Sequence, residues 1–284
     1  MTTFHLFRIK VLKRSQRPLF EPEQSTSEIL REAISQKPSA ELRKNHTWHI
    51  GNNTELDENG IYFAIGRTTT ATVPRYDKKE GNFTEAASDT APFTHVLADF
   101  QLQVAGIAAK SLVAPTVPDI ARKLEKVLNS APAASTHEVD FEICPITDPE
   151  TFIEILRSAY AIEKFSFTVS RPNPFDANKE IMRPLASFLS AASATRGRAS
   201  ISGTSLNADS LEDVARSAAV AGEDAEARVR VSAHETPVVK RLRGNAVALT
   251  EEEPDSKEKR LGLLARIRAT FSKLRQEPDV GSKS

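Results

Sequence analysis

The segment His95-Val-Leu-Ala-Asp-Phe-Gln-Leu-Gln-Val104 alternates apolar and polar side chains along its length. Successive side chains of a β-strand point to opposite faces, so a period of two predicts a strand with one buried face. The buried set would be Val96, Ala98, Phe100, Leu102 and Val104. The other face collects His95, Asp99, Gln101 and Gln103, and we expect it to meet water or a polar ligand.

The residues around this segment predict a first half that mixes strands and helices. Apolar residues at every second position predict a strand within the first 20 residues. Ser25-Thr-Ser-Glu28 has the pattern of a capping box and predicts the start of a helix. Asn59-Gly60 predicts a turn between strands at 46–50 and 61–65, and Thr116 precedes an amphipathic helical pattern.

A second half follows a stretch of small residues. Residues 131–138 contain Pro132, three alanines and one serine without periodicity, which predicts a linker between domains at 1–130 and 139–250. Alternation then predicts strands near 139–143, 165–169, 199–201 and 229–231. Helix starts are expected at Asp148-Pro149, at Asn173 or Asp176, and at Asn207 or Asp209.

The last residues, 251–284, differ in composition from the rest of the chain. Between 254 and 284 there are eight Lys/Arg and four Asp/Glu, and apolar residues form one narrow helical stripe: Leu261, Leu264, Ile267, Phe271 and Leu274. We expect a charged, partly helical tail outside the core. A basic amphipathic helix suits a partner protein, a second copy of the chain, an anionic membrane surface or a nucleic acid.

The predicted strands alternate and are not the continuous apolar runs of a parallel sheet that is buried on both faces. The expected fold is therefore α+β. It has mixed, largely antiparallel sheets with helices packed on one face, followed by the basic C-terminal helical tail.

Composition excludes several classes of protein. The 284 residues carry 38 basic and 38 acidic side chains, so any contact with nucleic acid must come from a local patch. One cysteine excludes an internal disulfide framework and a Cys-rich zinc site, and it suits a reducing cytoplasm. Because no apolar run approaches the ~20 residues of a membrane-spanning helix, we expect no transmembrane segment.

Two groups of residues are candidates for binding phosphate. Arg67, Thr68 and Thr69 combine a guanidinium with hydroxyl donors, and Arg75 follows on the same stretch. Arg171 precedes a predicted helix start, where backbone N–H groups favour anions. The alternative is structural: threonines suit strands, and Asn-Pro or Asp suits a helix cap.

The second predicted sheet offers a polar face. If its apolar residues meet the helices, the opposite face collects Arg198, Arg228 and Arg230 with hydroxyls of Ser166, Thr168, Ser200 and Ser202, and Asp140 and Glu142 join it. Such a face suits a nucleic-acid backbone, although aromatic residues for stacking bases are missing from it. It would equally suit solvent or the other domain.

Catalytic and metal chemistry have weaker signals. His95 and Asp99 on one strand face are a candidate acid–base couple. However, no Gly-x-Ser-x-Gly or phosphate-loop motif accompanies them. His46 and His49 would point to opposite faces of a strand, which disfavours a shared metal. We therefore expect no metal and no cofactor, and Cys144 is expected to be buried.

Three segments are similar to a family of uncharacterised bacterial proteins: Gly66-Arg-Thr-Thr-Thr, Thr90-Ala-Pro-Phe-Thr-His-Val96, and Phe165 through Ser170-Arg-Pro-Asn-Pro-Phe-Asp176. The resemblance covers residues 4–232 and excludes the tail. It implies a bacterial cytoplasmic protein, in a mobile-element or phage-defence setting, and it transfers no activity.

The sequence leads to one hypothesis on function and two alternatives. The first is a non-catalytic cytoplasmic binding protein that contacts nucleic acid or another phosphate-bearing ligand, as an accessory component of phage defence. The first alternative is a protein-interaction or oligomerisation module that docks through residues 254–284. The second is a phosphoester-cleaving enzyme that uses His95 and Asp99 with Arg67 as an anion clamp.

Overall fold

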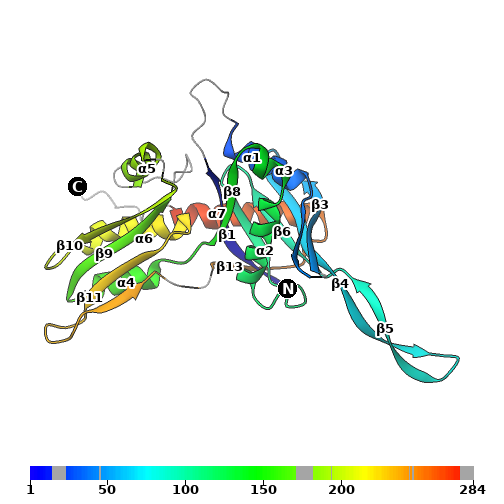
Figure 1. Ribbon diagram of the computed structural model, residues 1–284. Helices are drawn as coiled ribbons and strands as arrows, with labels where there is room; N and C mark the ends of the chain where they lie inside the picture. Colours follow the sequence, from blue (N-terminus) through cyan, green and yellow to red (C-terminus); the bar gives the residue numbers. More distant parts are fainter. Residues whose placement is uncertain are drawn as a thin grey trace.

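The strands form two separate sheets in the computed structural model, which describes residues 1–14, 24–44, 46–170, 182–192, 194–242, 244 and 246–275 (Figure 1). The larger sheet contains β1 (Thr2–Lys13), β2 (Ser39–Arg43), β3 (His46–Glu55), β4 (Gly60–Asp77), β5 (Asn82–Thr90), β6 (Phe93–Asp99), β7 (Val104–Ala108), β8 (Val139–Pro145) and β13 (Ala248–Glu251). The smaller sheet has the order β10 (Arg196–Ser202), β9 (Ala161–Ser170), β11 (Ala225–Arg230), β12 (Val238–Arg241).

All strand pairs described within the two sheets are antiparallel. The helices are α1 (Thr26–Ser35), α2 (Val117–Asn129), α3 (Pro132–Thr136), α4 (Glu150–Ser158), α5 (Met182–Ala191), α6 (Ala208–Ala221) and α7 (Lys257–Arg275). The predicted α+β fold is confirmed. Several predicted caps are confirmed as well: Ser25 with Glu28 forms a capping box before α1, Thr116 caps α2 and Asn207 caps α6.

The segment 95–104 is a hairpin and not one strand, which corrects the prediction. β6 ends at Asp99, and β7 begins at Val104 and returns beside it. The Asp99 carboxylate accepts a hydrogen bond from the Leu102 N–H at 2.6 Å, and Gln103 adopts a φ of 52°. Asp favours such local side-chain-to-backbone bonds, so the chain reverses while the alternation of the sequence continues through the turn.

Residues 131–138, predicted as a linker, belong to the core of the larger sheet. They contain α3, whose Ala133 and Ala134 are fully buried. β8 then pairs with residues 7–13 of β1. Asp140 and Glu142 therefore lie in the larger sheet and not on the second sheet where they were expected. The chain passes to the smaller sheet after Pro145 and returns to the larger one at β13.

Residues 257–275 are part of the core and not an appended tail. In Figure 1, α7 runs behind the larger sheet, on the side opposite α1 and α2. Leu263, Leu264, Ile267 and Phe271 are buried against residues of β1, β6 and β7. The larger sheet is thus covered on both faces, because the apolar stripe found in the sequence meets the chain's own sheet.

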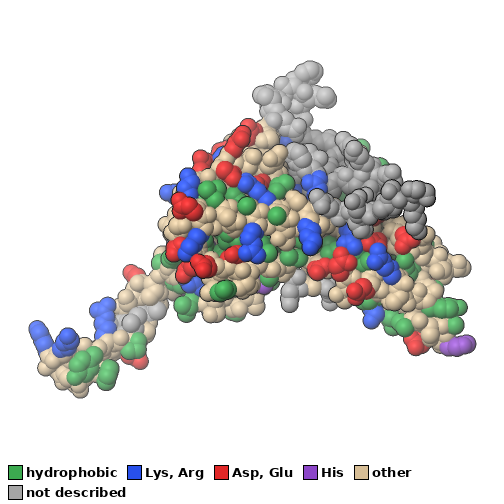
Figure 2. Space-filling model, turned by 180° about the vertical axis from the view of Figure 1, so that it is seen from behind, with side chains coloured by type: hydrophobic (Ala, Val, Ile, Leu, Met, Phe, Trp, Pro, Cys, Tyr) green, Lys and Arg blue, Asp and Glu red, His purple; other side chains and the backbone are tan. Residues whose placement is uncertain are grey.

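The hairpin of β4 and β5 extends away from the rest of the molecule as an arm (Figures 1 and 2). The three clusters of core residues contain no described residue between Arg67 and Phe93. At the tip, the rings of Tyr76 and Phe83 lie 5.1 Å apart between centroids and are exposed beside Lys78 and Lys79.

Candidate nucleic-acid interface

The smaller sheet presents a polar face opposite its helices, as the alternation predicted. Cross-strand pairing places Ser202, Lys164 and Arg228 in one row, and Ser200, Ser166 and Glu226 in the next. The apolar face of the same strands packs on α4, α5 and α6 through Phe165, Phe167, Val169, Ala225, Ala227 and Val229. Paired residues share a face, so side chains from three strands meet on the polar side.

A β-bulge shapes one end of this face. Arg228 pairs with Lys164, but Val229 pairs with Ile162, so Glu163 is an extra residue without a partner on β11. The Glu163 carboxylate lies 2.5 Å from Arg230 and 3.5 Å from Arg228. Bulges re-aim side chains, and here one carboxylate contacts both arginines. The sequence pattern places Glu163 with Phe165 on the apolar face and contains no signal of the bulge.

Beside this bulge the surface is hollowed into a groove of about 550 Å³, here called the Arg228 groove. It is lined by Tyr160, Ala161, Glu163, Lys164, Ser202, Gly203, Thr204, Arg228 and Arg230. Three cationic side chains face one carboxylate, which leaves a net charge of +2. The hydroxyls of Ser202 and Thr204 and the exposed ring of Tyr160 complete the lining.

One guanidinium in the groove has an unsatisfied donor. The Nε of Arg230 is buried and has no hydrogen-bond partner, although the same side chain bonds Glu163 through its terminal nitrogen. A buried donor without an acceptor costs free energy.

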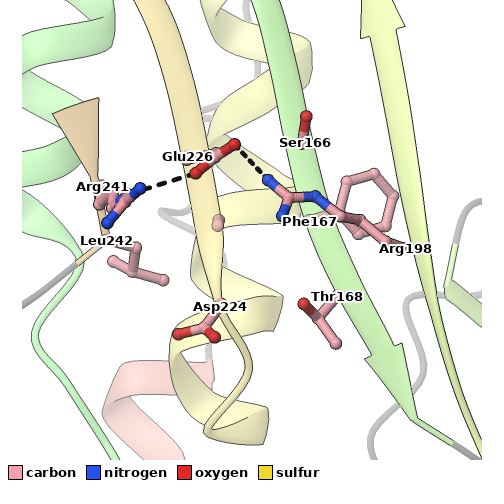
Figure 3. A pocket seen from close by; sticks show the side chains of 9 residues that line it. Ser166, Phe167, Thr168, Arg198, Asp224, Glu226, Arg241 and Leu242 are labelled. Atoms are coloured by element: carbon pink, nitrogen blue, oxygen red, sulfur yellow. Dashed lines mark hydrogen bonds and ion pairs between the residues drawn. The ribbon is translucent and has the colours of Figure 1, made fainter. Parts of the chain in front are cut away.

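A second hollow of about 190 Å³ lies further along the same face (Figure 3). There Glu226 lies between Arg198 and Arg241, and its two carboxylate oxygens each accept from one guanidinium. Asp224 adds another carboxylate to the lining. The two arginines are therefore matched by two acids, so this hollow carries less excess positive charge than the Arg228 groove.

The first group of residues predicted to bind phosphate lies in the larger sheet. Arg67, Thr68 and Thr69 are in the middle of β4 at the base of the arm, and Arg75 is exposed near its tip. Thr68 bonds His49 at 3.0 Å, and Thr69 pairs with Thr90 of β5. Among these four, Arg67 alone has a buried nitrogen, Nε, with no hydrogen-bond partner.

The residues predicted to bind phosphate therefore lie in two different sheets. Arg228 and Arg230 lie together in the groove, while Arg67, Thr68, Thr69 and Arg75 lie on β4. Arg171 lies outside the described residues. Three groove residues were not predicted from the sequence. Tyr160 directly precedes β9, Glu163 is the bulge residue of β9, and Thr204 follows the end of β10. Lys164 was within reach of the alternation argument, because it occupies a polar position of that strand.

His95 and Asp99 share a face of β6, as predicted, but both are engaged in contacts with other parts of the core. The Asp99 carboxylate accepts from Arg268 of α7 at 2.6 Å and is 2% exposed. His95 bonds the Tyr62 hydroxyl at 2.8 Å and Glu253 at 3.3 Å. Burial lowers the pKa of His95 below its ordinary value, and Glu253 partly opposes this.

Four basic side chains of α7, those of Lys259, Arg260, Arg266 and Arg268, are also paired within the chain. Arg266 contacts Glu251, and Lys259 contacts Glu252 and Asp255. Arg260 lies over the Tyr62 ring at 3.7 Å and donates to the Pro254 carbonyl. The sequence predicted this helix as a cationic binding element, but several of its positive charges are neutralised by acidic residues of the same chain.

Among the residues that the structure describes, His, Cys, Asp and Glu form no cluster of three or more suited to a metal ion. His49 bonds Ser39 and Thr68, while the Nδ1 of His46 is buried without a hydrogen-bond partner. Cys144 is partly buried on β8, and burial raises the pKa of its thiol to about 11.

Within the described ranges, no helix is both long enough and apolar enough to cross a membrane. No family model matches the chain, and no curated protein matches it. The resemblance to uncharacterised bacterial proteins therefore stays a prediction.

Proposed function

We propose that this protein is a non-catalytic binding protein that contacts nucleic acid, or another ligand with phosphate groups, through the polar face of its smaller sheet. The observation that supports this most is the Arg228 groove, where Lys164, Arg228 and Arg230 face only one carboxylate. The chain as a whole has no net charge, so a local excess of this kind is what an anionic ligand would find.

The geometry of the groove suits phosphate for two reasons. Arginine offers a planar set of donors that matches phosphate oxygens, and the hydroxyls of Ser202 and Thr204 add further donors. Phosphate contacts position a nucleic acid without reading its sequence, so this proposal includes no sequence preference.

The alternatives have less support. Docking on a partner through residues 254–284 would need an exposed apolar stripe, but the stripe of α7 is buried on the chain's own sheet. Phosphoester cleavage would need His95 and Asp99 to act together. Their described bonds instead join them to Tyr62, Glu253, Leu102 and Arg268.

A titration with a fluorescently labelled mixed-sequence oligonucleotide at about 50 and about 200 mM salt tests the proposal. We expect the affinity to fall as salt rises, because each neutralised phosphate releases counterions. The double variant Arg228→Gln/Arg230→Gln should bind more weakly at both salt concentrations. The slope of log binding constant against log salt concentration should become shallower by about 1 for each lost phosphate contact.

Arg122→Gln is the matched control, because Arg122 is an exposed arginine on α2 that pairs within its own helix. It should bind like the parent. Binding that does not depend on salt, or that is equal in the groove variant and the control, would rule out phosphate contact at this groove.

A further inference from the structure

The Arg228 groove combines its cations with one exposed aromatic ring. Tyr160 lies between α4 and β9, directly before the strand that carries Glu163 and Lys164, and is 62% exposed. It lines the groove together with Arg228 and Arg230. Among the described ring and cation contacts its ring has none, and most of the residue is open to solvent.

An exposed ring beside a phosphate-binding cluster has a specific chemical meaning. Cations alone bind any polyanion, including a duplex, through its phosphates. A flat aromatic surface strengthens binding further only when the ligand has an unstacked base whose π-face can lie on the ring. The bases of a duplex are stacked on one another, whereas those of a single strand are free to turn toward a protein ring.

We infer that the ligand class of the Arg228 groove is single-stranded nucleic acid, with one base stacked on Tyr160 and the adjoining phosphate held by Arg228, Arg230 and Lys164. This inference rests on the function proposed above and narrows it. The hydroxyls of Ser202 and Thr204 lie in the same lining, so they are placed to bond the sugar–phosphate backbone beside the stacked base.

The test compares three probes at one salt concentration: a labelled single strand, the same sequence as a duplex, and inorganic polyphosphate, which has phosphates but no bases. We expect the single strand to bind most tightly. Tyr160→Ala should weaken binding of the single strand about 5- to 150-fold, the range that base–aromatic stacking gives per base. The same variant should bind polyphosphate like the parent.

Two further variants separate stacking from a structural effect. Tyr160→Trp should restore binding, and its new indole should be quenched by the single strand, whereas the buried Trp48 provides a constant background. Tyr76→Ala is the matched control, because Tyr76 is a comparably exposed tyrosine on the arm. It should leave binding of the single strand unchanged. DNA and RNA strands of one sequence, compared directly, assign the source of the ligand.

The outcomes distinguish this inference from the proposal beneath it. Equal binding of single strand, duplex and polyphosphate, with no effect of Tyr160→Ala, would overturn the single-strand assignment and leave a general phosphate-binding groove. If none of the three probes binds, or if Arg228→Gln/Arg230→Gln binds all three like the parent, the proposed function itself fails.

Discussion

At the scale of single residues, Arg268 of α7 connects two other parts of the larger sheet. It donates to both carboxylate oxygens of Asp57, at 2.6 and 2.9 Å, and to the buried Asp99 at 2.6 Å. It therefore joins α7 to the turn before β4 and to the end of β6. Hydrogen bonding from Arg268 lowers the pKa of Asp57 from its ordinary value of 3.8 to about 2.

Arg268→Gln should destabilise the protein by about 1–3 kcal/mol at pH 7, because it leaves the buried Asp99 carboxylate short of a donor. The lowered pKa of Asp57 stabilises the fold above about pH 4, and this contribution is lost as pH falls toward 2. The difference between parent and variant should therefore shrink below pH 4.

Urea unfolding of both proteins at pH 7, 5, 4 and 3 measures this difference. Arg14→Gln removes an exposed arginine that bonds Asp140 and should change stability by less than about 0.5 kcal/mol. A stability difference for Arg268→Gln that grows on acidification would contradict the role assigned to Asp57.

At the scale of elements, α7 shows how an apparently surface helix becomes core. Its Phe271 is 1% exposed and lies below the guanidinium of Arg8, 5.4 Å from ring centroid to cation. Gly106 of β7 leaves room for Ile267: a Cβ at that glycine would lie 2.5 Å from the Ile267 side chain. The close approach of α7 to the sheet depends on this small residue.

Phe271→Ala should cost about 3–5 kcal/mol, the usual loss when a buried phenyl ring is removed from a packed core. Phe83→Ala makes the same chemical change at the exposed tip of the arm and should cost less than about 0.5 kcal/mol. Denaturant midpoints of the two variants measure the contrast. Equal midpoints would mean that α7 is not packed on the sheet as described.

At the scale of the whole molecule, β1 holds distant parts of the chain together. It pairs with β7 on one side, and with β13 and then β8 on the other. Lys10 of β1 also bonds Glu223 at 2.5 Å and Ser170 of β9 at 3.4 Å, where the two sheets meet. On β10, Arg196 reaches Glu142 of β8 at 2.6 Å. The two halves are thus joined by charged contacts as well as by the chain.

A fragment of residues 1–130 should therefore not fold cooperatively, because it loses β8, β13 and α7 and leaves one side of β1 unpaired. Residues 146–246 retain the whole apolar core between the smaller sheet and α4, α5 and α6, so this fragment should unfold cooperatively. Circular dichroism against urea compares the two fragments. A sharp transition for residues 1–130 would show that the first half is stable without the later strands.

Some parts of the candidate interface follow from local sequence pattern, and others depend on how distant segments of the chain meet. The polar face of the smaller sheet follows from alternation, and Arg228 and Arg230 were found in this way. The groove itself was not, because it depends on the bulge at Glu163 and on Tyr160 in a connection without periodicity. Likewise, the alternation placed Asp99 on the correct face of its strand. It could not identify the partner of Asp99, because Arg268 of α7 follows 169 residues later in the sequence.

The sequence alone therefore determined the α+β class, the antiparallel sheets and the capped helix starts, since side-chain period and cap chemistry are local properties. Tertiary structure alone decided that residues 131–145 and 257–275 complete the larger sheet and its core. Strand partners and the face on which a helix packs depend on burying matching apolar surfaces from distant parts of the chain, and no local pattern identifies that match.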